Sequence, residues 1–122
     1  MIRGIGTDII EIDRISRAVK KDYFLKRAFS EGEIVMAKER NTDVFLAGNF
    51  AVKEAFVKAL GIGFRGIGLK DLEVLRDKYG KPFIRICNPE NIHLMDINEK
   101  NIYVSISNTN SLVVAIVVIE VD

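Results

Sequence analysis

The sequence has one cysteine, one histidine and no tryptophan among its 122 residues. With Cys87 alone, a disulfide within the chain and a cysteine-rich zinc site are excluded, and we expect this side chain to be a small hydrophobe in a strand. With His93 alone, a histidine-based metal cluster is excluded as well. Any metal ion must therefore depend on carboxylates, which favour a hard cation such as magnesium.

The chain also lacks a strong charge of either sign and a long apolar run. Its 18 basic and 17 acidic residues give a net charge of +1, which argues against a highly basic nucleic-acid-binding protein but leaves local charged patches possible. The longest apolar run, residues 112–119, is far shorter than the roughly 20 residues of a membrane helix, and the N-terminus has no signal-peptide pattern. We expect one cytoplasmic domain over residues 1–122, with no membrane association.

The clearest helix is predicted at residues 49–61, which are rich in helix-forming residues and end on Gly61, a typical C-terminal cap. Its apolar residues recur at helical spacing, so one stripe is expected to pack on the core. Glu54 and Lys58 are four residues apart and share a face. Such a pair is usually a solvated ion pair that stabilises the helix by about 0.2–0.5 kcal/mol. The alternative is that the pair belongs to a larger site.

An acidic residue lies within the first predicted strand, residues 1–10, where Gly4 and Gly6 would bring the strand close to other backbone. Burying the carboxylate of Asp8 without a partner would be costly. Asp8 could instead form local hydrogen bonds with Thr7, as a cap or turn. Both interpretations remain open at this point.

A basic surface is predicted on the short helix at residues 12–19 and just beyond it. Arg14, Arg17 and Lys21 recur at spacings of three and four residues, and Lys20 lies beside them. Such a surface can be merely solvated, or it can dock an acidic partner.

The rest of the chain predicts further helices followed by strands. Ser30 and Glu33 form a capping box for a helix that ends near Arg40, and residues 41–43 cap the central helix. The glycines of residues 61–66 have the spelling of a dinucleotide fingerprint, but they follow a helix, so a loop is predicted. Strands are expected at residues 72–75, 83–87, 102–106 and 112–120, with a hairpin turn at residues 77–82 and the last strand central and buried. This order indicates an α+β fold, a largely antiparallel sheet against a long central helix.

Four motifs, in this order, resemble those of the holo-acyl-carrier-protein synthases, the small trimeric branch of the 4′-phosphopantetheinyl transferases. They are Gly4-Ile-Gly-Thr-Asp-Ile-Ile-Glu-Ile-Asp-Arg-Ile15, Phe50-Ala-Val-Lys-Glu-Ala-Phe-Val-Lys-Ala-Leu-Gly61, Gly80-Lys-Pro82 and Val104-Ser-Ile-Ser107. The resemblance implies transfer of 4′-phosphopantetheine from coenzyme A to a serine of apo acyl carrier protein. It also implies magnesium dependence, release of adenosine 3′,5′-bisphosphate and a homotrimer.

The resemblance assigns catalytic roles to Asp8, Glu54 and Lys58. Asp8 and Glu54 would bind the magnesium ion, and Lys58 would contact the phosphates of coenzyme A. These groups suit the chemistry, because negative charge on the pyrophosphate must be neutralised during transfer. The base that accepts the serine proton would be Glu54 or a metal-bound water held by Asp8 or Glu54.

The resemblance also places substrate-binding residues in the second half of the chain. Ser105 and Ser107 would lie near the nucleotide end of coenzyme A, and Lys81 with Pro82 near the adenine and its 3′-phosphate. Arg14 would contact acyl carrier protein, with Arg17, Lys20 and Lys21 as further candidates.

Two positions depart from the family pattern, in which histidines flank the Val-Ser-Ile-Ser motif. This chain has Tyr103 and Asn108 there. Asn108 can donate a hydrogen bond to a phosphate but carries no charge, so coenzyme A affinity is the property in question.

Two other functions stay open on the sequence. One is a coenzyme A or nucleotide-binding module without transfer activity, and the other is a trimeric scaffold whose basic helix binds an acidic protein. The implied trimer would place the active sites between subunits, with residues 112–119 near the threefold contact.

Overall fold

The predicted α+β architecture is confirmed by a computed structural model that describes residues 1–122. Four helices lie in the first half and most of the strands in the second. The elements are β1 (Ile2–Glu11), α1 (Ile12–Ala18), α2 (Asp22–Ala28), α3 (Glu31–Lys38), α4 (Thr42–Leu60), β2 (Leu72–Arg76), β3 (Pro82–Ile86), β4 (Ile102–Asn108) and β5 (Leu112–Glu120). Short 3-10 turns precede β2 at Leu69–Asp71 and β4 at Glu99–Asn101.

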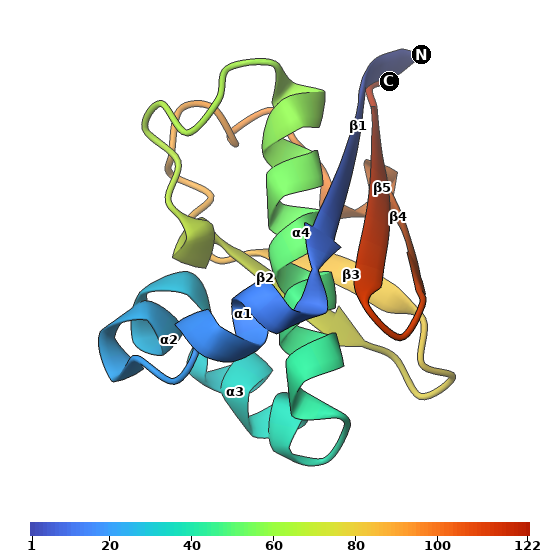
Figure 1. Cartoon of the computed structure of the whole chain (residues 1–122). Coiled ribbons are helices and arrows are strands. Elements are labelled where there is room, and N and C mark those ends of the chain that lie inside the picture. The colour runs from blue at the N-terminus through green and yellow to red at the C-terminus, as the bar shows by residue number, and fades with distance from the viewer.

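Two antiparallel sheets surround the long helix α4 (Figure 1). The larger sheet has the order β1-β5-β4, and the smaller is the β2-β3 hairpin. The register of the larger sheet sets Asp8 opposite Ala115 and Ser105 opposite Ile116. The two ends of the chain lie side by side, where Val121 N donates to Met1 O at 2.8 Å. The first strand is thus fixed by the last one.

Helix α4 lies against β1 without intervening side chains at two points. A Cβ atom added to Gly4 would be 1.9 Å from the carbonyl oxygen of Ala59, and one added to Gly6 would be 1.8 Å from that of Ala55. Only glycine allows this approach. The sequence-based expectation that the two glycines bring the strand close to other backbone is confirmed.

The helix is longer and more deeply buried than a single apolar stripe predicts. It begins at Thr42, where the side chain of Asn41 accepts from Val44 N as expected of a cap, and it ends at Gly61 with φ of 79°. Both sides are covered, because the larger sheet lies on one side and α1, α3 and β2 pack elsewhere on the helix (Figure 1). The helix therefore forms the centre of the hydrophobic core rather than one wall of it.

Helix α2 was not predicted from the sequence. Its apolar side comprises Phe24, Leu25 and Ala28, of which Ala28 is fully buried. Lys26 and Asp22 form an ion pair of 3.0 Å across one turn on the exposed side.

Strand β5 is central, as predicted, but only one of its faces is buried. Val113, Ala115 and Val117 are fully buried against α4, whereas Val114 and Ile116 are 42% and 40% exposed. Cys87 also departs from expectation, because it is exposed and follows the end of β3. No helix has the combination of length and apolar composition needed to cross a bilayer.

Candidate functional site

The first two members of the site come from β1 and α4. Lys58 Nζ donates to Asp8 Oδ1 at 3.1 Å and to the carbonyl oxygen of Thr7 at 3.0 Å. The Asp8 side chain is 16% exposed and that of Lys58 57% exposed. Asp8 is thus neither a cap nor a turn residue. Lys58 pairs with Asp8 and forms no ion pair with Glu54, so the interpretation as a simple ion pair along one helix is wrong.

Glu54 is the third member and lies half-buried one turn before Lys58. Burial raises the pKa of its carboxyl group, and the negative charge of Asp8 raises it further. The positive charges of Lys58 and Arg14 act in the opposite direction. Two carboxylates that repel each other in this way attract a divalent cation.

The donor set fits magnesium. No group of three or more histidine, cysteine, aspartate or glutamate side chains could hold a metal ion in this structure. Two carboxylates with room for phosphate oxygens and water are a typical magnesium environment, whereas calcium and zinc are usually enclosed by more protein ligands. Asp8 and Glu54 are the residues that would hold the ion.

A pocket of about 410 Å³ opens beside Glu54. The loop after α4 supplies apolar walls through Phe64, Ile67 and Leu69, and α2 contributes Arg27. Residues 61–66 follow helix α4 and form a loop, as predicted, and only Phe64 of this stretch lines the pocket.

Some of the residues connected with the nucleotide end, namely Lys81, Pro82, Tyr103 and Asn108, line pockets around the β2-β3 turn. Pro82 and Asn108 line a second pocket of about 270 Å³, and Lys81, Pro82 and Tyr103 line a third of about 360 Å³. Asn108 Nδ2 donates to Thr109 O at 3.2 Å. The Tyr103 hydroxyl donates to Glu120 Oε1 at 3.1 Å, and this hydrogen bond raises the pKa of Tyr103.

Ser105 and Ser107 do not join these pockets in the single chain. Residues alternate along β4, and both serines occupy its exposed face with Tyr103, whereas Val104 and Ile106 face inward. The register places Ser105 opposite the exposed Ile116, on the face of the sheet away from Asp8.

The basic residues expected to bind a partner lie on α1 and the turn after it. Arg14 is exposed and close enough to Glu54 to affect its pKa. Arg17 is exposed and pairs with Asp13 at 3.1 Å. Lys20 and Lys21 are exposed, and Lys21 precedes α2 as its N-terminal cap. Arg14 thus connects the basic surface with the carboxylates.

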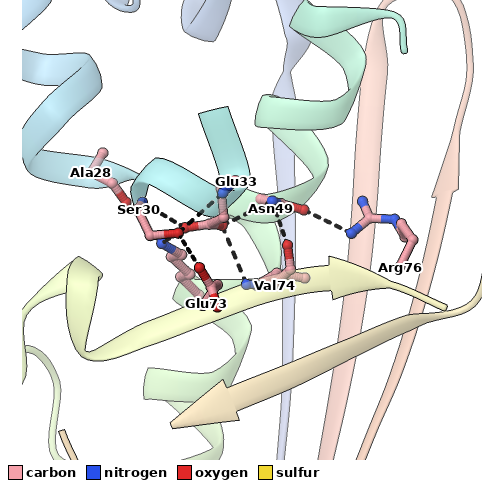
Figure 2. Close-up of polar contacts among 8 residues, drawn as sticks. Ala28, Ser30, Glu33, Asn49, Glu73, Val74 and Arg76 are labelled. Carbon is pink, nitrogen blue, oxygen red and sulfur yellow. Dashed lines mark hydrogen bonds and ion pairs between the residues drawn. The ribbon is translucent and has the colours of Figure 1, made fainter. Parts of the chain in front are cut away.

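A buried polar network behind the site was missed by the sequence analysis (Figure 2). Lys53 Nζ pairs with Glu33 Oε1 at 2.7 Å, and Asn49 Nδ2 donates to Glu33 Oε2 at 2.8 Å. All three residues are 0% exposed. Glu33 was recognised only as half of a capping box, which is confirmed. Lys53 could have indicated this network, because the helical period places it on a different face of the helix from Glu54 and Lys58.

Comparisons with known proteins agree on one family. The model of the 4′-phosphopantetheinyl transferase superfamily matches residues 4–117. The holo-[acyl-carrier-protein] synthase of Clostridium botulinum (strain Eklund 17B / Type B) is 48% identical, over 99% of this chain and 99% of its own. That of Clostridium beijerinckii is also 48% identical, over 98% of each chain.

Solved structures that resemble this chain belong to the same family. The crystal structure of a holo-(acyl-carrier-protein) synthase from Bacillus anthracis in complex with CoA (3′,5′-ADP) aligns with a TM-score of 0.83 at 36% identity, over 100% of this chain and 99% of that one. The Helicobacter pylori synthase in complex with coenzyme A aligns with a TM-score of 0.82 at 34% identity, over 95% and 99%.

Proposed function

The chain belongs to the 4′-phosphopantetheinyl transferase superfamily, in its holo-[acyl-carrier-protein] synthase branch, and we propose that Asp8, Glu54 and Lys58 form its reaction centre. The enzyme transfers 4′-phosphopantetheine from coenzyme A to a serine of apo acyl carrier protein, releases adenosine 3′,5′-bisphosphate and so primes fatty acid biosynthesis. The observation that carries the proposed centre is the convergence of two carboxylates and a lysine from β1 and α4. Both substrates dissolve in water, and we propose a cytoplasmic location.

Asp8 and Glu54 would hold a magnesium ion, which when bound neutralises negative charge on the pyrophosphate of coenzyme A. Lys58 would exchange its contact with Asp8 for a phosphate oxygen, since its side chain is the most exposed of the three. This positions the β-phosphorus and stabilises charge that develops on the leaving group.

The pocket beside Glu54 would receive the pantetheine arm along its apolar wall of Phe64, Ile67 and Leu69. Lys81, Pro82 and Asn108 would lie at the nucleotide end of coenzyme A. Their grouping around two adjoining pockets supports this assignment.

Acyl carrier protein would dock on the basic surface formed by Arg14, Arg17 and Lys21. Arg14 is the residue that approaches Glu54, so a partner held there would present its serine to the carboxylates. Electrostatic attraction to an acidic partner would speed the encounter and weaken with salt.

A homotrimer with active sites between subunits is supported by the outer face of the larger sheet. Apolar side chains on β1 and β5 are exposed there, with Ile5 at 57%, Ile9 at 63%, Val114 at 42% and Ile116 at 40%. A face of this kind is commonly an interface between proteins. Ser105 lies on it and would reach coenzyme A bound to a neighbouring subunit. Light scattering should give three times the monomer mass, and an active monomer would contradict the proposal.

Intact-mass spectrometry of apo acyl carrier protein tests the reaction and its metal together. Incubation with the enzyme, coenzyme A and magnesium should add one phosphopantetheine group, and a chelator should prevent the addition. Coenzyme A binding without any addition would instead indicate a binding module, with Tyr103 and Asn108 the first residues to examine.

A further inference from the structure

The loop that follows α4 supplies most of the apolar wall of the pocket beside Glu54, yet part of it forms no backbone ladder. None of the 70 backbone–backbone hydrogen bonds of the protein involves residues 62–67, which are called the wall loop below. Phe64 in this loop is 43% exposed. Segments with so few hydrogen bonds open more readily than helices or strands. The wall formed by Phe64, Ile67 and Leu69 therefore needs support from outside the loop.

This support comes from the connection between β3 and β4. In Figure 1 that connection, residues 87–98, runs beside the wall loop. Asn91 Nδ2 donates to the carbonyl oxygen of Gly66, and this is the single hydrogen bond that the wall loop makes. The His93 ring lies against the same glycine, where a Cβ atom would be 3.4 Å from its Cδ2 and Nε2. Leu94, 1% exposed, fixes the connection in the core.

The amide group of Asn91 can face the wall loop in only one way. Its Oδ1 accepts from His93 N at 3.0 Å, within its own loop. The amide nitrogen then faces two groups that only accept, the Gly66 carbonyl and Asp71 Oδ2 at 3.4 Å. Asp71 Oδ2 also accepts from Gly68 N at 2.9 Å. Asn91 thus connects the wall loop with the turn that leads into β2.

Asn91 itself stays outside the substrate pockets. It lines none of the three that the proposed function assigns to coenzyme A, whereas Phe64, Ile67 and Leu69 line the one of about 410 Å³. Its influence on a bound substrate must therefore pass through the position of the wall.

We propose that Asn91 is a positioning residue for the pantetheine arm of coenzyme A, because it holds the wall loop where its apolar side chains can meet the arm. The inference rests on the proposed function, which supplies the arm. The pantetheine arm carries no charge, so its binding depends on apolar surface in the right place. A wall loop released from Asn91 would lose part of this contact and leave the nucleotide end bound as before.

Asn91→Asp isolates this role from the structure of the connection. It keeps the side-chain volume and the acceptor for His93 N, and it removes the donor to Gly66. The introduced carboxylate would also face Asp71 and be repelled by it. The wall loop should therefore be released at least as far as in Asn91→Ala. Hydrogen exchange of its amides should become faster in both variants.

Calorimetry should compare coenzyme A with 3′-phosphoadenosine 5′-diphosphate, which keeps the nucleotide and the pyrophosphate but lacks the arm. Both Asn91 variants should bind coenzyme A about threefold to tenfold more weakly than the wild type and bind the armless ligand equally well. The KM for coenzyme A should rise by a similar factor with kcat unchanged, since the proposed reaction centre lies on β1 and α4. Asn98→Ala is the matched control, because Asn98 Oδ1 accepts from Lys100 N at 2.9 Å and has no hydrogen bond to the wall loop.

Unchanged affinity for coenzyme A in both Asn91 variants would overturn the inference. An equal loss with both ligands would overturn it as well, because it would indicate a general loosening of the fold. A wild-type enzyme that transfers nothing to apo acyl carrier protein would contradict the proposed function. A loss confined to coenzyme A in Asn91→Asp would even then support the role of Asn91 in binding the arm.

Discussion

A Cβ atom at Gly6 would lie 1.8 Å from the carbonyl oxygen of Ala55, so β1 and α4 touch backbone to backbone. Asp8 follows Gly6 by two residues on the same face of the strand, and Glu54 precedes Ala55 directly. The glycine contact therefore sets the spacing between the two carboxylates. The two sides of the proposed metal site are brought together by packing rather than by a loop.

Gly6→Ala should push β1 away from α4 and separate Asp8 from Glu54. We expect a loss of about 3 kcal/mol or more in the free energy of unfolding, with loss of transfer activity in whatever protein folds. Urea denaturation and the mass assay measure the two effects. Gly68→Ala is the control for stability, because a Cβ atom there would meet nothing within 4 Å and its φ of −98° suits any residue. Equal stability of the two variants would contradict the close approach.

Lys53→Met should destabilise the fold by about 3–5 kcal/mol, because it leaves the carboxylate of Glu33 buried without its ion-pair partner. Lys26→Met offers a comparison, since the Lys26–Asp22 pair is about 70% exposed and should be worth no more than about 0.5 kcal/mol. Denaturant unfolding at one protein concentration measures both. Similar losses of stability in the two variants would contradict the burial of the Lys53–Glu33 ion pair.

Caps and hydrophobic periodicity predicted most of the helices and strands, but few of the contacts between them. The capping box at Ser30, the cap at Asn41 and the C-terminal Gly61 are each confirmed, because these depend on neighbours in sequence. Helix α2 was missed because seven residues with one buried alanine give almost no periodic signal.

The site was predictable only in part. Asp8, Glu54 and Lys58 were named together through the family motifs, because nothing in residues 1–10 or 49–61 alone relates Asp8 to the helix. The links among Asn49, Lys53 and Glu33 span 16 and 20 positions, and no local rule couples them. The same holds for Arg40 and Arg76, whose guanidinium groups both lie over the Phe45 ring although they are far apart in the sequence.

The stability of the metal-free enzyme should fall as pH rises from about 4.5 through the raised pKa of Glu54. Within this window the folded protein keeps a proton that the unfolded chain has lost, so deprotonation costs stability. Glu54→Gln should remove this dependence and be more stable at neutral pH by less than about 1 kcal/mol, since the group is half-exposed and screened. Thermal unfolding in chelator across pH measures it. If Glu54→Gln were less stable than the wild type at neutral pH, the raised pKa of Glu54 would be contradicted.

Arg14→Ala should mainly weaken the use of acyl carrier protein. We expect the KM for carrier protein to rise several-fold and the affinity for coenzyme A to stay the same, because the exposed guanidinium lies on the docking side of Glu54. The salt dependence of the reaction should also become less steep. Arg85→Ala on β3 is the control. An unchanged KM for carrier protein in Arg14→Ala would exclude this docking surface.

Magnesium binding by Asp8 and Glu54 together is the proposed basis of phosphopantetheine transfer. It is tested most directly by stripping the enzyme with chelator and titrating magnesium back, while the mass of acyl carrier protein is followed for wild type, Asp8→Asn and Glu54→Gln. Each variant removes one charged oxygen ligand and almost no volume, so we expect folded proteins with little or no turnover at magnesium concentrations that saturate the wild type. Full magnesium-dependent activity in both variants would show that the metal site lies elsewhere.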